Sequence, residues 1–136
     1  MTTYTDPDDD RFFFEPRERQ QGLLTYQMRE FLIGERDLGD AGYAQARQRL
    51  RDRIRHGLID FEYLQLLKDK DRSIIFKELA NPPFPDGEPE LEVGMSRGIQ
   101  HLFGFLYDGI ERHSTANFET YFQNGLEHIP LRRSDD

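Results

Sequence analysis

The protein has 136 residues, a length typical of one domain with enough chain to bury a single core, which excludes a multidomain enzyme. It contains no cysteine, which excludes a disulfide framework, a thiolate nucleophile and a Cys-ligated zinc or iron–sulfur centre. No apolar stretch approaches the roughly 20 residues that span a membrane, and the acidic N-terminus is unlike a signal peptide, so we expect a cytoplasmic protein without a membrane partner.

The charged residues are skewed in two ways. Twenty-six acidic residues against eighteen basic residues give a net charge of −8, and fifteen of the basic residues are Arg while only three are Lys. An acidic surface that is poor in Lys suits a protein kept soluble in concentrated salt, so we expect a halophilic source. A GC-rich genome that favours Arg codons is the alternative explanation.

Residues 1–20 combine an acidic run at Asp8–Asp10 with two prolines and show no hydrophobic period. Such a segment buries too little apolar surface to offset the entropy of ordering it, so we predict a disordered acidic tail. Within it, Phe12–Phe14 is costly to leave in water, and we expect it to dock onto the core of its own chain. Residues 21–136 are predicted to form a single helical domain.

The first helical period has apolar residues at Leu24, Met28, Phe31 and Leu32. It predicts a helix over about residues 25–35, with Thr25 as its N-cap and Gly34 as its stop. After a short connection, Asp40 is placed to cap a second helix that begins near Ala41.

The second helix is the main feature of the sequence. Its apolar stripe consists of Tyr43, Ala46, Leu50, Ile54, Leu58, Phe61 and Leu64. Only Gly57 interrupts the pattern before about Lys68, which gives a helix of roughly 42 Å. That is long for one helix of a small globule, so we predict a kink near Gly57 or a second chain alongside. We expect a homodimer whose interface includes Tyr43, Leu50, Ile54 and Phe61.

The third helix is predicted over residues 72–80, capped by Asp69 or Asp71. Three prolines within four residues end it near Asn81, because proline lacks the backbone N–H and restricts the residue before it. Residues 81–96, which are rich in Pro and Glu, are therefore predicted to be a linker loop inside the domain.

Two further helices complete the predicted fold. The fourth covers about residues 96–112, with an exposed ion pair between Asp108 and Arg112. The fifth follows Asn117 as its N-cap and runs to Ile129; the rival prediction is a winged-helix hairpin over 118–131, turning at Asn124-Gly125. The helical period favours the helix. The fold class is thus all-α, about five helices in a compact bundle, with a helix-turn-helix-like N-terminal half.

Several segments resemble small uncharacterised proteins of haloarchaea. The resemblance lies in Leu24–Thr25, Arg29–Glu35, Gly57–Phe61, Phe105–Ile110 and Asn117–Glu119. These segments cover about half of the chain and consist of capping and core residues. The resemblance implies an archaeal, halophilic source and a helical C-terminal segment, and it implies no activity or site residue.

The sharpest local signal is a run of alternating arginines on the second helix. It consists of Arg47, Arg49, Arg51, Arg53 and Arg55. On a helix these residues form two rows that flank the apolar stripe, one of three arginines and one of two. Arg side chains bind phosphate oxygens and guanine edges, and the first two predicted helices, joined by a short connection, have the order of a helix-turn-helix. Together these features predict a DNA-binding, regulator-type protein.

The alternative is a helical protein–protein interaction or assembly module whose arginine rows pair with carboxylates. The sequence has ample acidic residues for this pairing. Salt also weighs against simple phosphate binding: with about five phosphates neutralised, a tenfold rise in salt lowers affinity roughly 10⁴-fold. A DNA binder in concentrated salt would need base contacts, or cation uptake by acidic groups near the DNA backbone.

No pattern in the sequence predicts an enzyme. The four histidines are scattered, and neither a metal-binding spacing nor a phosphate-binding glycine loop is present. Glu111 and His113 stand two residues apart and point to different helix faces, which makes them a poor acid–base pair. We therefore predict no catalytic residue, no metal, no cofactor and no small-molecule substrate.

Overall fold

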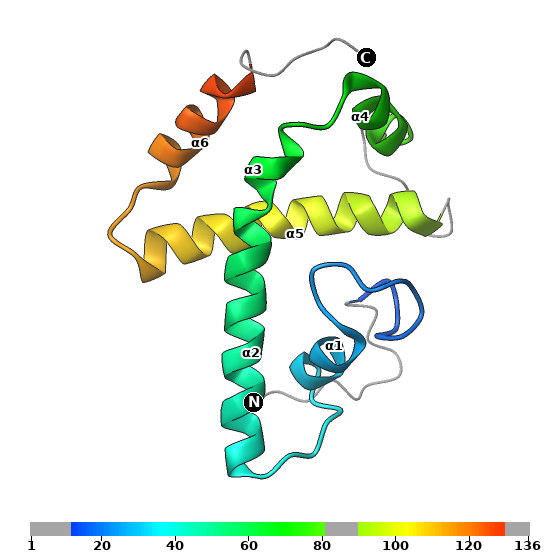
Figure 1. Ribbon diagram of the computed structural model, residues 1–136, viewed down its shortest axis with the longest axis vertical. Helices are drawn as coiled ribbons and strands as arrows, with labels where there is room; N and C mark the ends of the chain where they lie inside the picture. The colour runs from blue at the N-terminus through cyan, green and yellow to red at the C-terminus, as the bar shows by residue number, and fades with distance from the viewer. Residues whose placement is uncertain (1–11, 81–89, 130–136) are drawn as a thin grey trace. The chain divides into compact units, whose positions relative to one another are not determined.

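The computed structural model describes residues 12–80 and 90–129, and this part of the chain contains six helices and no strand, as expected for an all-α fold (Figure 1). The backbone contacts group into two compact units, Met1–Leu64 and Gln65–Asp136. The sequence pattern predicted one domain over residues 21–136. Each unit is described below by itself.

The first helix of the first unit, α1 (Tyr26–Leu32), begins and ends as predicted. The Thr25 hydroxyl accepts a hydrogen bond from the backbone N–H of Met28 at 3.1 Å, which confirms the N-cap. Gly34 adopts a φ of 85°, a left-handed conformation that favours glycine, and the next N–H, that of Glu35, donates to the Glu30 carbonyl. This Schellman arrangement ends the helix.

Helix α2 (Asp40–Ile59) differs from its prediction at both ends. Its N-cap is Gly39, so the prediction of Asp40 as the cap is wrong; Asp40 lies in the first turn, where its charge complements the helix dipole. The helix ends at Ile59, well before residue 68, and the N–H of its C-cap Asp60 is shared between the His56 and Gly57 carbonyls. A single short turn of helix, α3 (Phe61–Leu64), follows.

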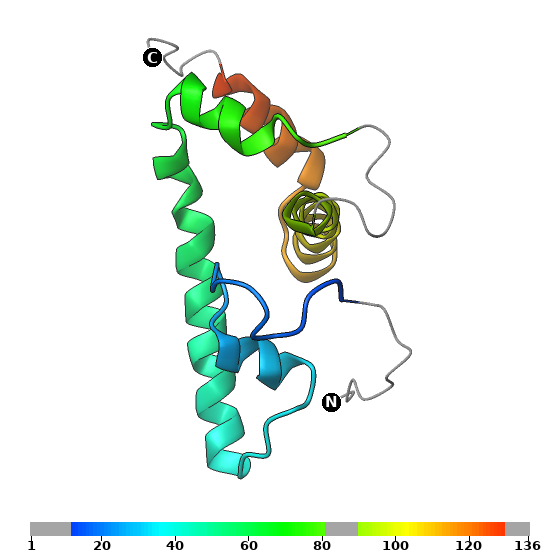
Figure 2. The ribbon, with the colours of Figure 1, turned by 90° about the vertical axis from the view of Figure 1, so that its right-hand side faces the viewer.

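The segment that precedes α1 lies beside it (Figure 2), and arginine side chains join the two. Arg29 donates to the carbonyls of Pro16 and Gln20, each at 2.7 Å, and Arg17 binds the Glu30 carboxylate through two hydrogen bonds. Residues 12–20 of the predicted tail lie in the described part of the chain, where the half-buried Arg29 side chain donates to the carbonyls of Pro16, Arg19 and Gln20. Residues 1–11 lie outside the described part of the chain.

The core of the first unit forms between α1 and α2. Phe31 and Leu50 are buried, and the Phe31 ring lies 5.7 Å from the ring of Tyr43. The Tyr43 hydroxyl donates to the Arg36 carbonyl at 3.2 Å. Of the predicted oligomer interface, Tyr43 thus has contacts inside the unit, Leu50 is buried, Ile54 is half-buried and Phe61 is 50% exposed.

The second unit begins with α4 (Asp69–Phe76), which starts three residues before its prediction. Its N-cap is Lys68, without a side-chain hydrogen bond, so neither Asp69 nor Asp71 is the cap. Both carboxylates lie in the first turn instead, where negative charge is favourable.

Helix α5 (Glu90–His113) begins earlier than predicted. The prediction of a loop is wrong for residues 90–96, while residues 81–89 lie outside the described residues. Glu92, whose acidity indicated a linker, lies in the first turn of the helix, where its negative charge is favourable. The predicted pair of Asp108 and Arg112 is confirmed at 2.8 Å.

Helix α6 (Phe118–Glu127) confirms the helical prediction, and the hairpin alternative is wrong. Asn117 caps it by accepting from the N–H of Thr120 at 2.9 Å. The helix packs on α5 through the Phe118 ring, whose centroid lies 5.4 Å from that of Tyr107, and within α6 the Phe118 ring stacks on Phe122 at 6.0 Å.

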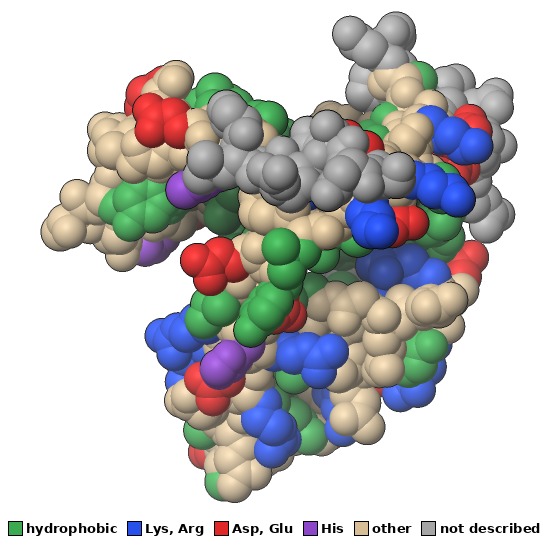
Figure 3. Space-filling view, turned by 45° about the horizontal axis from the view of Figure 1, so that its top comes forward, with side chains coloured by type: hydrophobic (Ala, Val, Ile, Leu, Met, Phe, Trp, Pro, Cys, Tyr) green, Lys and Arg blue, Asp and Glu red, His purple; other side chains and the backbone are tan. Residues whose placement is uncertain are grey.

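The second unit leaves large apolar side chains open to the surface (Figure 3). On α5, on α6 and directly after α6, several large apolar side chains are at least two-fifths exposed. They are Leu91, Phe103, Phe105, Tyr107, Tyr121, Phe122, Leu126 and Ile129. An apolar surface of this kind is typical of a protein that binds another macromolecule.

Candidate nucleic-acid interface

All five arginines of the predicted DNA-binding run lie on α2, and all five are exposed. Blue side chains gather around this helix in Figure 3. The contacts of these arginines divide them into the two rows that the helical period predicts, but the rows have different roles.

The first row consists of Arg47, Arg51 and Arg55, and we call it the Arg47 row. Arg47 makes no hydrogen bond or ion pair with any described residue, and Arg51 donates only to the neutral Gln48 side chain at 2.7 Å. Arg55 lies 3.7 Å from the Asp52 carboxylate in a pair whose side chains are 68% and 52% exposed. An exposed pair of this length contributes little, so most of the positive charge of the row faces solvent.

Arg53, in the second row, is a structural residue. Its Nε donates to the Leu23 carbonyl at 2.8 Å, and its Nη2 lies 3.4 Å from the Gly22 carbonyl. These contacts tie the segment before α1 to the middle of α2. The partners are 30 residues apart, and no sequence spacing predicts such a contact.

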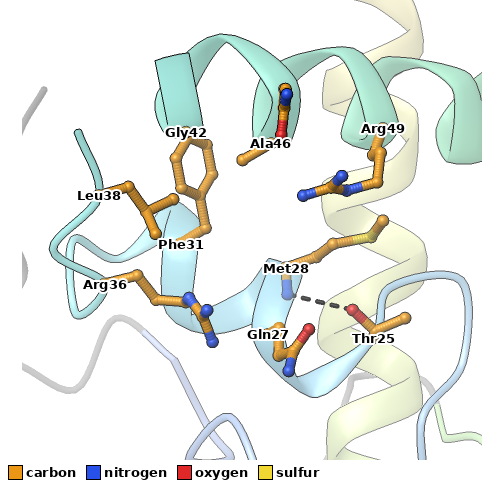
Figure 4. Close-up of a pocket in the computed structure, with 10 residues that line it drawn as sticks. Thr25, Gln27, Met28, Phe31, Arg36, Leu38, Gly42, Ala46 and Arg49 are labelled. Atoms are coloured by element: carbon orange, nitrogen blue, oxygen red, sulfur yellow. Dashed lines mark hydrogen bonds between the residues drawn. The ribbon is translucent and has the colours of Figure 1, made fainter. Parts of the chain in front are cut away.

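Arg49, the other member of the second row, lines a pocket between α1 and α2 (Figure 4). It makes no hydrogen bond or ion pair with the described residues. The pocket has a cavity volume of about 420 Å³ and a mixed apolar and polar lining. The second row therefore lies on the flank of α2 that faces α1 and the segment before it, and the Arg47 row lies on the other flank of the apolar stripe.

Sequence reasoning missed the charged cluster beside α1. Burial lowers the pKa of Arg29, and the nearby charge of Arg19 lowers it further. The hydrogen bond from Arg17 holds the pKa of Glu30 below its usual range, with Arg36 a second cation 3.7 Å away. The only sequence signal for this cluster is the density of Arg before residue 30, which a tail would also show.

Helices α1 and α2 follow each other in the order of a helix-turn-helix, but the connection between them is longer than the turn of that motif. Seven residues, 33–39, connect α1 to α2, and α2 is 20 residues long. A helix-turn-helix joins its helices by three or four residues. The structure thus gives no recognition helix of the usual geometry, and the candidate interface is the exposed flank of α2.

Glu111 and His113, which the sequence analysis rejected as an acid–base pair, contact different partners in the structure. Glu111 accepts a hydrogen bond from the N–H of Phe118 at 2.6 Å and so helps to start α6, while the His113 ring lies 3.8 Å from the Asp108 carboxylate. Within residues 12–80 and 90–129, no three His, Asp or Glu side chains are grouped closely enough to hold a metal ion. None of the helices in this part of the chain has the length and apolar composition of a membrane span.

Comparisons with known proteins give one result. Residues 23–134 match the model of DUF8102, a domain of unknown function. The comparison with curated proteins and the comparison with solved structures each find no match.

Proposed function

The chain belongs to the DUF8102 family, and from the geometry of α2 we propose that it is a small DNA-binding, regulator-type protein that contacts the phosphates of duplex DNA through the Arg47 row. The observation that supports this proposal is the exposure of three guanidinium groups on one flank of one helix, opposed by a single exposed carboxylate. Guanidinium groups bind phosphate oxygens through paired, charge-assisted hydrogen bonds.

The dimensions of the row suit a nucleic-acid backbone. Arg47 and Arg55 are eight residues apart, which corresponds to about 12 Å along the helix axis. Phosphates of one DNA strand follow each other every 3.4 Å or so along the duplex axis, so the row spans about three of them. We expect contacts to phosphate rather than to bases, because the connection before α2 lacks helix-turn-helix geometry.

The test is the salt dependence of duplex binding, measured by fluorescence anisotropy from about 50 mM to about 500 mM salt. Each phosphate contact contributes about 0.9 to the slope of log affinity against log salt. Changing Arg47, Arg51 and Arg55 together to Gln should therefore flatten the slope by two to three. The matched control is Arg112→Gln, which removes an exposed arginine from the second unit and should leave the slope unchanged.

Two results would remove the proposal. One is the absence of duplex binding at any salt concentration, and the other is an unchanged slope in the triple Gln variant. The corresponding triple Lys variant keeps the three charges, so it should retain the slope even where it loses paired hydrogen bonds. A Lys variant that behaves like the Gln variant would indicate a folding defect, which circular dichroism detects independently.

One observation favours a second candidate, a helical protein–protein interaction or assembly module. The second unit exposes large apolar side chains, and its sequence carries thirteen acidic residues against eight basic ones. In this case the Arg47 row would pair with carboxylates of a partner, such as a second copy in a homodimer. Sedimentation at low salt distinguishes the candidates: the triple Gln variant should dissociate such a dimer, whereas a DNA binder should keep its oligomeric state.

We also propose that the source of the protein is halophilic, which the composition supports. Acidic residues outnumber basic ones by eight, and Lys is nearly replaced by Arg. A halophilic protein should lose helicity in dilute buffer and regain it in molar KCl, as measured by circular dichroism. Full helicity in dilute buffer would support the explanation from genome composition.

A further inference from the structure

The pocket between α1 and α2 has an apolar floor. Met28 and Phe31 come from α1, Ala46 comes from α2, and Leu38 comes from the connection between them. In Figure 4 the Met28 side chain extends along the floor, and the Phe31 ring stands beside Gly42. The volume of about 420 Å³ lies in the range of sites that bind small molecules.

Cationic and amide groups surround this floor. Arg49 turns from α2 toward the space between the helices, above Met28, and makes no hydrogen bond or ion pair with the described residues (Figure 4). Arg36 also lines the pocket, and its nearest carboxylate, Glu30, lies 3.7 Å away and already holds two hydrogen bonds from Arg17. The remaining polar lining residues, which carry no charge, are Thr25, Gln27 and Gln45.

The pocket therefore combines a surplus of positive charge with an apolar surface. We propose that it binds a small amphipathic carboxylate, with the carboxylate on Arg49 and the apolar body against Met28 and Phe31. A guanidinium fits a carboxylate through two parallel hydrogen bonds, and an apolar body gains free energy by leaving water. The polar lining residues are Thr, Gln and Arg, so the site offers groups that bind rather than groups that transfer protons.

This site is independent of the proposed DNA contact. Arg49 belongs to the row that faces α1, whereas the Arg47 row lies on the opposite flank of the apolar stripe. Loss of DNA binding and loss of carboxylate binding are therefore separate experimental results, and each proposal can fail without the other.

Octanoate is the probe, and octanol, which has the same apolar body without the charge, is its control. Octanoate is titrated into the ¹⁵N-labelled full-length protein, and backbone amide shifts are followed by NMR. The perturbed amides should lie in Thr25–Leu32 and Leu38–Arg49. Octanoate should bind more tightly than octanol, because only the carboxylate engages Arg49.

Two variants test the assignment. Arg49→Gln should weaken octanoate binding roughly tenfold and leave octanol binding unchanged, since it removes one charge-assisted contact. Arg112→Gln removes an exposed arginine of the second unit and should bind octanoate like the native protein. Ala46→Phe places a ring in the pocket and should abolish binding of both probes, with the amide shifts of the second unit showing that the protein remains folded.

Several results would overturn the proposal. They are the absence of shifts at millimolar octanoate, shifts confined to the exposed apolar residues of the second unit, equal binding of octanol and octanoate, and native affinity in Arg49→Gln. An Arg49→Lys variant should recover part of the affinity, because it restores the charge without the paired geometry. Failure of Arg49→Lys to exceed Arg49→Gln would also contradict the assignment.

Discussion

Both units join helices through aromatic rings, but the first unit also uses arginine side chains to hold an irregular segment in place. In the first unit, arginine side chains reach backbone carbonyls and a carboxylate: Arg29 binds three carbonyls, Arg53 binds two and Arg17 binds Glu30. In the second unit, the Tyr107 ring of α5 meets the Phe118 ring of α6. The first unit uses polar contacts to order an irregular segment, and the second uses aromatic contacts between regular helices.

The difference shows how a chain with few apolar residues can order a long connecting segment. Carbonyls of an irregular segment have no helical partners, and a guanidinium can satisfy several of them at once. The same residue type is therefore structural at Arg29 and Arg53 and open to solvent at Arg47. The contacts of each arginine, and not its residue type, decide its role.

The largest expected effect is the loss of the apolar contact that α1 makes with α2. Phe31 is 5% exposed, so Phe31→Ala should destabilise the first unit by about 3–5 kcal/mol through lost burial and a cavity. Thermal unfolding followed by circular dichroism, with NMR for unit-specific readout, measures this. Phe103→Ala, at a side chain that is 51% exposed, should cost much less, and equal losses would contradict the assignment of the core.

A smaller effect tests the structural role of arginine. Arg53→Gln removes the donor to the Leu23 carbonyl and should cost about 1 kcal/mol, with faster amide exchange in the segment before α1. Arg47→Gln, on the same helix, removes no hydrogen bond to a described residue and should change stability by less than about 0.5 kcal/mol. If the two variants were equally stable, the division of the arginine run into two roles would be wrong.

A loss of stability of similar size is expected in the second unit when the N-cap of α6 is removed. Asn117→Ala removes the acceptor for the N–H of Thr120 and should destabilise α6 by about 1 kcal/mol. Hydrogen exchange should quicken in the first turn of α6 and stay unchanged in α1. Asn117→Asp preserves the acceptor and should retain the stability, so a loss in both variants would argue against capping.

The smallest effect concerns pH and is confined to the first unit. Arg17 lowers the folded-state pKa of Glu30, so the stability that this carboxylate contributes is complete above the ordinary glutamate pKa of about 4.3 and is lost as the pH falls through the lowered value. NMR titration should show the Glu30 carboxyl returning toward its ordinary pKa in Arg17→Gln. An unchanged titration curve in that variant would show that the pair does not form in solution.

Much of the helical structure could be predicted from local patterns. The caps Thr25 and Asn117, the stop at Gly34 and the pair of Asp108 and Arg112 each involve residues within five positions of one another. Two of the errors concern acidic helix starts, at Asp40 and Asp69. There, a carboxylate that could cap a helix lies in the first turn instead, and both positions satisfy the same electrostatic preference.

The candidate site was predictable only in part. The alternation of arginines on a helix predicts two rows, and the structure has both. Which row faces solvent depends on the segment near Leu23, whose carbonyl binds Arg53, and on the pocket beside Arg49. Neither follows from the spacing of the arginines, because the partners lie far away in the sequence.

The sequence by itself determined the all-α class, most of the helices and the arginine rows, because caps, helical periods and charge spacing act over a few residues. The tertiary structure alone decided that residues 12–20 contact α1, that Tyr43 packs on Phe31 within the first unit, and that Arg53 binds distant carbonyls while Arg47 faces solvent. These outcomes depend on contacts between distant residues, whose free energies no local pattern specifies.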